Sequence, residues 1–175
     1  MLFPLCFRLL DYSLYSIPPP TSRPPAGGFF GPGLPSIAKS LIFATVMDLD
    51  KVQYWCEVSD YDLETAEAMF RTGRWLYVGF MCHQALEKVF KAYWSRKKEE
   101  PAPFTHNLLN LAQSCGLAQL LSDEQRAFVS EVMPLNIEAR YPSYKQSLGD
   151  SLSEERCKTL IDKTKSLQEW VKTKL

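Results

Sequence analysis

The stretch from Arg74 to Lys98 constrains the fold of this chain more than any other part of the sequence. Its apolar side chains recur every three to four residues, which predicts one long amphipathic helix. The apolar face comprises Leu76, Phe80, Leu86, Phe90 and Trp94. At 1.5 Å per residue the helix would extend for roughly 37 Å. The rest of the chain must therefore supply elements that pack along this face.

Three polar residues interrupt the apolar pattern of this helix. His83, Glu87 and Lys91 are four positions apart, so they lie along nearly one line of the helix. That line runs beside, and partly within, the face that we expect to be buried. An exposed Glu87–Lys91 pair would contribute only about 0.3–0.5 kcal/mol. Two interpretations remain open: a buried histidine satisfied by one hydrogen bond, or a histidine and carboxylate that face a ligand groove.

Residues 48–72 predict a second long helix, with Asp48 as a plausible N-cap. Gly73 follows its last apolar position and is expected to end it. The connection to the helix that begins at Arg74 is therefore very short. Two long helices joined in this way should lie antiparallel.

The remainder of the chain predicts one short and two long helices. The short helix covers roughly residues 107–115 and is closed by Gly116. Ser122 and Ser151 each precede Gln or Glu by three positions, the pattern of a capping box that opens a helix. Pro134 is expected to kink or split the first of these two helices. Because no alternating strand pattern follows Met47, we predict an all-α fold, an antiparallel helical bundle of four long helices plus one short helix.

Residues 1–46 differ in composition from the rest of the chain. They hold eight of the twelve prolines and four of the eight glycines, and proline at this density prevents regular helix and strand interiors. We predict a disordered extension in residues 1–46 and a helical domain in residues 47–175. Because Met47 begins a clean new pattern, residues 1–46 could also be translated upstream sequence rather than the native start. Neither a signal peptide nor a membrane span is indicated.

Charge and cysteine content narrow the classes of function. The formal net charge is zero, which excludes a global basic field of the kind that nucleic-acid-binding proteins carry. The five cysteines are odd in number and form no C-x-x-C pair, so neither a disulfide framework nor a zinc ribbon is supported. We expect a cytoplasmic protein. Two histidines without a third ligand at fixed spacing indicate no metal site, and we expect no cofactor.

Two further positions are candidates for ligand binding. His106 stands at the start of the predicted short helix, where free N–H groups favour an anion. Arg140 is held at a rigid corner by Tyr141 and Pro142. Its guanidinium could bind a phosphate while Tyr141 or Tyr144 stacks on a base. Alternatively, His106 is only a surface or capping side chain, and Arg140 pairs with Glu138 or with carbonyl groups of the last helical turn.

These segments together resemble the HEPN domain family over about residues 48–173. The resemblance is carried by CHQALEKVFKAYW in the long helix, THNLLNL after it, and NIEARYPSY further on. It implies an antiparallel helical bundle that commonly forms a homodimer. It also implies a nucleotide- or RNA-related role, often beside a minimal nucleotidyltransferase as partner, in toxin–antitoxin or defence settings.

The ribonuclease branch of that family uses an arginine, usually followed by a polar residue, and a histidine with four to six residues between them. Arg140 matches the arginine, and Tyr141 stands where the polar residue would be. No histidine follows, since residues 145–147 are lysine, glutamine and serine. The RYP form resembles the branch that binds nucleotides. The resemblance therefore implies a binding role for Arg140 and Tyr141 and assigns no catalytic residue.

Three hypotheses follow. The leading one is a dimeric module that binds a nucleotide or RNA; its binding residues would be Arg140, Tyr141, His83, Glu87, Lys91 and His106. The rival is a metal-independent ribonuclease in which His83 or His106 replaces the missing histidine. The third is a purely structural dimerisation module that uses the apolar surface of Trp75, Tyr77 and Trp94.

Overall fold

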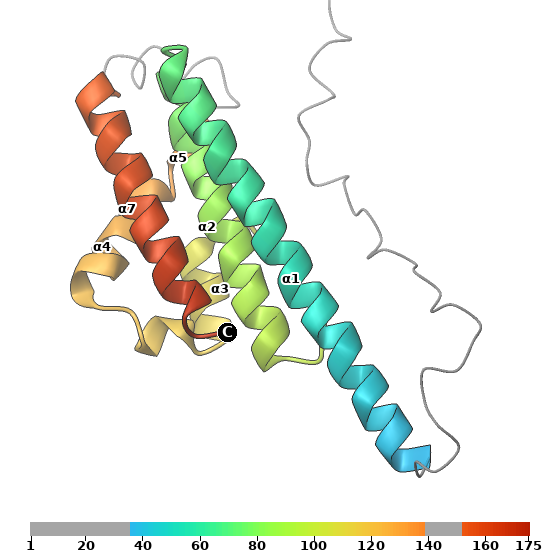
Figure 1. Ribbon diagram of the computed structural model, residues 1–175. Helices are drawn as coiled ribbons and strands as arrows, with labels where there is room; N and C mark the ends of the chain where they lie inside the picture. Colours follow the sequence, from blue (N-terminus) through green and yellow to red (C-terminus); the bar gives the residue numbers. More distant parts are fainter. Residues whose placement is uncertain (1–35, 139–151) are drawn as a thin grey trace, which may run out of the picture.

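The computed structural model describes residues 36–138 and 152–175, with side chains described for residues 51–137 and 152–175 (Figure 1). Every element in these ranges is helical: α1 (Ser36–Arg71), α2 (Trp75–Lys97), α3 (Leu108–Ser114), the 3-10 turn η3 (Leu117–Gln119), α4 (Asp123–Val132), α5 (Leu135–Glu138) and α7 (Glu154–Lys172). The predicted all-α bundle is confirmed. None of these described helices is long and apolar enough to cross a membrane.

Helices α1 and α2 form the predicted antiparallel hairpin (Figure 1). The turn between them is closed by hydrogen bonds from Gly73 N to Phe70 O, 3.0 Å, and from Arg74 N to Met69 O, 2.9 Å. Gly73 has a φ of 67°, a left-handed conformation that glycine adopts without steric cost. The expectation that Gly73 ends the first helix is therefore confirmed.

Helix α1 begins earlier than the sequence suggested. It starts at Ser36, whereas the pattern placed the start near Asp48, so residues 36–46 are helical rather than part of an irregular extension. The physical reason lies in where the prolines stop. The last proline of the N-terminal segment is Pro35, and the next is Pro101, so nothing after Pro35 interrupts the backbone hydrogen bonds of α1. Residues 1–35 lie outside the described residues, and the expectation for them stays a prediction.

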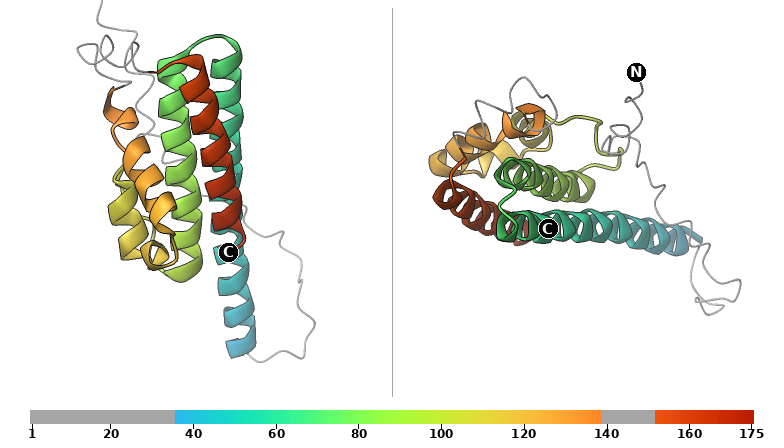
Figure 2. Two further views of the ribbon diagram at one scale, coloured as in Figure 1. Left: turned by 90° about the vertical axis from the view of Figure 1, so that its left-hand side faces the viewer. Right: turned by 90° about the horizontal axis from the view of Figure 1, so that it is seen from above.

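Helix α2 is the central element of the bundle. Figure 2 shows it enclosed between α1, α7 and the α3–α5 region. Every residue from Val78 to Ser95 is buried except Lys88, which is half-buried. A helix covered on all sides is usually apolar all round. Helix α2 instead carries charged and polar side chains into the interior, and these build the candidate site.

The caps of the later helices were predicted in part. Asn107 caps α3 by accepting a hydrogen bond from Asn110 N, 2.9 Å, and Ser122 forms the predicted capping box at α4. Pro134 separates α4 from α5, as expected for a proline inside a helical pattern.

The prediction that Ser151 caps the last helix is wrong. The N-cap of α7 is Ser153, whose Oγ accepts a hydrogen bond from Arg156 N at 3.2 Å. Leu152 and Cys157 are both buried in the core, and they occupy the two positions of a hydrophobic staple around a cap at Ser153. Burial of this apolar pair, rather than the serine–glutamate spacing, sets where α7 begins.

Candidate functional site

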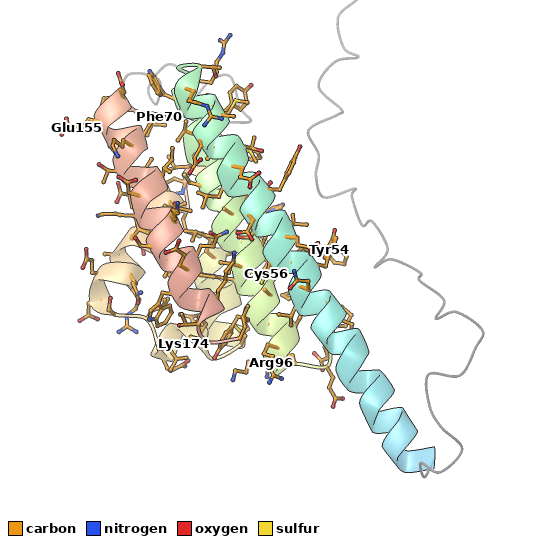
Figure 3. The ribbon with its side chains drawn as sticks, viewed as in Figure 1. Tyr54, Cys56, Phe70, Arg96, Glu155 and Lys174 are labelled. Atoms are coloured by element: carbon orange, nitrogen blue, oxygen red, sulfur yellow. The ribbon has the colours of Figure 1, made fainter. Side chains whose placement is uncertain are left out.

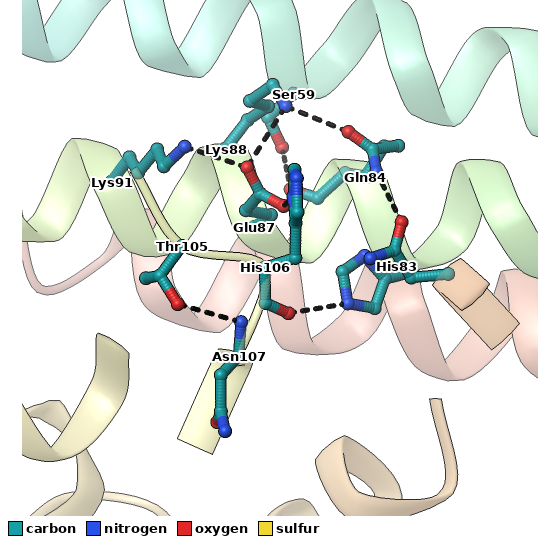
Figure 4. A network of polar contacts seen from close by, with 11 residues as sticks. Ser59, His83, Gln84, Glu87, Lys88, Lys91, Thr105, His106 and Asn107 are labelled. Atoms are coloured by element: carbon teal, nitrogen blue, oxygen red, sulfur yellow. Dashed lines mark hydrogen bonds and ion pairs between the residues drawn. The ribbon is translucent and has the colours of Figure 1, made fainter. Parts of the chain in front are cut away.

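The candidate site is centred on the buried carboxylate of Glu87 (Figure 4). Glu87 Oε1 accepts hydrogen bonds from Lys91 Nζ at 2.7 Å and from Lys88 Nζ at 3.4 Å. Glu87 Oε2 accepts from His106 Nδ1 at 2.8 Å. The side chain is 1% exposed. Helix α2 supplies three of these four residues, because positions 87, 88 and 91 lie on adjoining faces of one helix.

The partners of Glu87 keep its carboxylate ionised. Burial by itself raises the pKa of Glu87. The hydrogen bond from His106 and the charges of Lys88 and Lys91 outweigh burial and hold the pKa below its ordinary value. A negative charge is therefore permanently present inside the bundle at neutral pH.

His106 links this buried charge to the surface. Its ring crosses over α2 from the segment before α3, and its side chain is 42% exposed (Figure 4). Because Nδ1 donates to Glu87, the neutral ring carries its hydrogen on Nδ1 and leaves Nε2 as an acceptor. Within residues 51–137 and 152–175, nothing is hydrogen-bonded to His106 Nε2. That nitrogen is free to contact a ligand.

The segment that carries His106 is fixed by several hydrogen bonds. Thr105 N donates to Pro103 O at 2.9 Å, and Asn107 N donates to Thr105 Oγ1 at 3.1 Å. The carbonyl oxygen of His106 accepts a hydrogen bond from His83 Nε2 at 3.1 Å. The backbone and the ring of His106 are thus held by separate contacts, to His83 and to Glu87.

His83 lies fully inside the protein. Burial lowers its pKa from 6.5 to about 4, with the charge of Glu87 opposing this effect, so the ring is neutral at physiological pH. Its Nε2 donates to the His106 carbonyl, and its Nδ1 is a buried acceptor that lacks a partner among the described residues. His83 can therefore influence a ligand only by positioning His106, not by direct contact at the surface.

Four residues that the sequence did not single out complete the cluster. Lys88 Nζ donates to Gln84 Oε1 at 2.9 Å, and Gln84 Nε2 donates to Asn136 Oδ1 on α5 at 3.3 Å. Asp62 on α1 is buried, which raises its pKa to about 6; the charge of Lys88 lowers it and that of Glu87 adds to the rise. The signal for Asp62 was its helical spacing from buried Ser59 and Ala66, which placed a carboxylate on the inward face.

The structure brings four of the predicted site residues together. His83, Glu87, Lys91 and His106 form one connected group. Arg140 and Tyr141 lie outside the described residues, and α5 ends at Glu138. Their place relative to the cluster stays a prediction. Glu87, Asp62, Lys88 and Lys91 sum to zero charge when all are ionised, so the cluster is not a basic patch.

A groove of about 410 Å³ lies elsewhere, between α4 and α7, where Phe128 and Trp170 are among its lining residues. It contains none of the predicted site residues. The described residues also bring together no three histidine, cysteine, aspartate or glutamate side chains that could hold a metal ion. The Glu87 cluster is therefore the candidate that the sequence and the structure share.

Comparisons with known proteins identify a family model and a similar fold. The HEPN domain family model matches residues 52–174, a range that runs from α1 to α7 and contains the whole cluster. Among solved structures, the chain is similar to TT1696 from Thermus thermophilus, with a TM-score of 0.62 and 16% sequence identity. The similarity covers 71% of this chain and 98% of the other, and at that identity it shows the fold alone. No curated protein sequence matches.

Proposed function

The chain belongs to the HEPN domain family, and from this premise we propose that it is a nucleotide- or RNA-binding helical domain. The phosphate of its ligand lies at His106, whose imidazolium form donates from Nδ1 to Glu87 and from Nε2 to a phosphate oxygen. Arg140 is the second phosphate contact, and Tyr141 lies beside it. One observation carries the proposal. A half-exposed imidazole is tied through Nδ1 to a buried, ionised glutamate while its Nε2 stays without a partner among the described residues.

The buried residues act by positioning that imidazole. Glu87 fixes the ring and His83 fixes the backbone of the same residue, so the ligand does not have to order them. Lys91 and Lys88 keep Glu87 charged. Because the charges of Glu87, Asp62, Lys88 and Lys91 cancel, affinity depends on directed hydrogen bonds, donated by the imidazolium of His106 and by Arg140, rather than on a positive field.

A binding titration tests this proposal. Labelled ATP, GTP and short RNA are titrated into the wild type, His106→Ala and Arg140→Ala, with Lys165→Ala on the exposed face of α7 as the matched loss of a charge. A charged hydrogen bond contributes about 1.5–3 kcal/mol, so each site variant should bind about 10- to 150-fold more weakly. Arg140→Ala binding as tightly as the wild type would remove Arg140 from the site, and a wild type without affinity would refute the function.

We also propose that the domain forms a homodimer and pairs with a minimal nucleotidyltransferase in a toxin–antitoxin or defence setting. The family membership supports this assembly. If a neighbouring reading frame encodes a small nucleotidyltransferase, the two chains are co-expressed and purified together. Light scattering should then give one species whose mass is that of a complex containing both chains. Separate elution of the two chains would exclude the partnership.

A metal-independent ribonuclease is the second candidate, and the Glu87–His106 pair favours it. A carboxylate that orients an imidazole can make it a general base. His106 Nε2 would take the proton of a ribose 2′-hydroxyl, and the 2′-oxygen would bond to the adjacent phosphorus. The bond from phosphorus to the 5′-oxygen would break, and that oxygen would take a proton from solvent. The products are a 2′,3′-cyclic phosphate and a 5′-hydroxyl end.

Cleavage of RNA in EDTA separates the two candidates. Loss of a general base typically lowers the rate by about 10²–10⁴-fold, so His106→Ala should be nearly inactive if the enzyme is real. His83→Ala is included because His83 sets the position of His106. Absence of cleavage by the wild type would remove the ribonuclease and leave the binding proposal standing.

A further inference from the structure

A large aromatic side chain stands fully in solvent beside the candidate site. Phe104 is 90% exposed and lies two positions before His106. Burying a phenylalanine side chain typically stabilises a protein by about 1.5–3 kcal/mol, a gain that this residue does not make within the chain. Single exposed apolar residues are common, so the exposure alone decides nothing.

The backbone around Phe104 is held firmly. On its C-terminal side, Thr105 N is bonded to the carbonyl of Pro103, and His106 is anchored by both its ring and its carbonyl. Pro103 has a fixed φ on the other side. The backbone at Phe104 is therefore held in place, and its exposed ring projects from a preorganised loop.

A second aromatic group adjoins the same cluster from α1. Lys91 Nζ lies 5.2 Å from the centre of the Trp55 ring while it donates to Glu87, which in turn accepts from His106. Tyr54 packs edge-on against Trp55, with ring centres 5.2 Å apart. Figure 3 shows Tyr54 projecting from the side of α1 that faces away from α7. Half-exposed aromatic rings on α1 and the imidazole of His106 are thus joined through one chain of contacts.

We propose that Phe104 is a stacking residue for an unpaired nucleobase whose phosphate is held at His106. This inference rests on the proposed nucleotide- or RNA-binding function and specifies its ligand as single-stranded. Every base has a π-face, and an exposed ring on a fixed backbone offers it a partner without ordering of the loop. Bases inside a duplex are already stacked and paired, so duplex RNA cannot use Phe104 in this way.

The experiment compares three substitutions at Phe104, with Leu120→Ala as a matched loss of an exposed apolar side chain. Binding of one short RNA is measured single-stranded and as a duplex, and sedimentation gives the oligomeric state. Stacking contributes about 1–3 kcal/mol per base, so Phe104→Ala should weaken single-strand binding about 5- to 150-fold. Phe104→Leu should be equally weak, Phe104→Trp should restore binding with quenched fluorescence, and Leu120→Ala should bind like the wild type.

Several results would overturn the inference. If Phe104→Ala binds normally while His106→Ala does not, stacking is absent but the proposed function survives. If Phe104→Ala changes the oligomeric state, the ring is a subunit contact. If duplex and single-stranded RNA bind equally tightly, no unpaired base stacks on Phe104. If the wild type binds no RNA or nucleotide, the proposed function itself has failed and this inference falls with it.

Discussion

Replacing Asp62 by asparagine removes a buried charge between α1 and α2 while keeping the size of the side chain. The residue is 5% exposed, and burial raises its pKa from 3.8 to about 6 in spite of Lys88. At about 1.4 kcal/mol per pKa unit, this difference corresponds to about 3 kcal/mol. The folded state binds the proton more tightly, so the free energy of unfolding falls as the pH rises from 3.8 to about 6. Asp62→Asn should therefore be more stable by up to about 3 kcal/mol at about pH 7.5, and nearly unchanged at about pH 4.

The pKa of His83 adds a second measurable effect, on how the stability of Asp62→Asn depends on pH. Burial lowers its pKa from 6.5 to about 4, so the unfolded state binds more protons between these values and stability rises with pH across them. In the wild type this trend opposes that of Asp62. Asp62→Asn leaves His83 alone, so its stability should climb by about 3 kcal/mol from about pH 4 to about pH 6.5, where the wild type changes little.

Urea unfolding followed by circular dichroism at several pH values measures both effects. Asp162→Asn serves as the control, because its side chain is 64% exposed and, among the residues that the structure describes, is paired only with Lys158 across one turn of α7. The control should change stability by less than about 0.5 kcal/mol at every pH. If Asp62→Asn is no more stable than the wild type at neutral pH, the attraction of Lys88 outweighs burial and the reasoning is refuted.

Three other substitutions test the structure. Glu87→Gln should lower the free energy of unfolding by about 3 kcal/mol at neutral pH, because Lys91 loses its buried counter-charge. The difference from the wild type should shrink as the pH falls below 4.5, where the wild type begins to lose the stability that ionised Glu87 contributes. A difference that does not depend on pH in urea unfolding would contradict this. Ser153→Ala should cost about 1 kcal/mol of thermal stability through the lost cap of α7, and a neutral result would place the cap elsewhere. Gly116→Ala should cost about 1 kcal/mol by calorimetry because its φ is 83°, whereas stabilisation would mean that the turn adopts another conformation.

Much of the fold could be predicted from the sequence because local signals and burial agree there. The apolar spacing of α1 and α2, the glycine between them and the capping box at Ser122 all specify the same hairpin and bundle. The cap of α7 was misassigned because two serines are nearby and only tertiary burial of Leu152 selects Ser153. The start of α1 was misplaced because average composition was taken as the boundary, although the prolines themselves stop at Pro35.

The candidate site was predictable along one helix but not across helices. The four-residue spacing placed His83, Glu87 and Lys91 on one line, which the structure buries as a group. That His106 would bond to Glu87 with its ring and to His83 with its carbonyl depends on the path of the loop, which no periodicity encodes. The same holds for Asp62, whose neighbours Lys88 and Glu87 belong to another helix.

The double attachment of His106 has a consequence for how sequences of this kind can vary. Every amino acid has a carbonyl oxygen, so a change of side chain at position 106 removes the link to Glu87 and preserves the link to His83. A change in the number of residues between α2 and α3 shifts both attachments at once. Related chains should therefore tolerate substitutions in this connection more readily than insertions or deletions. We expect the length of the connection to vary less among them than its sequence.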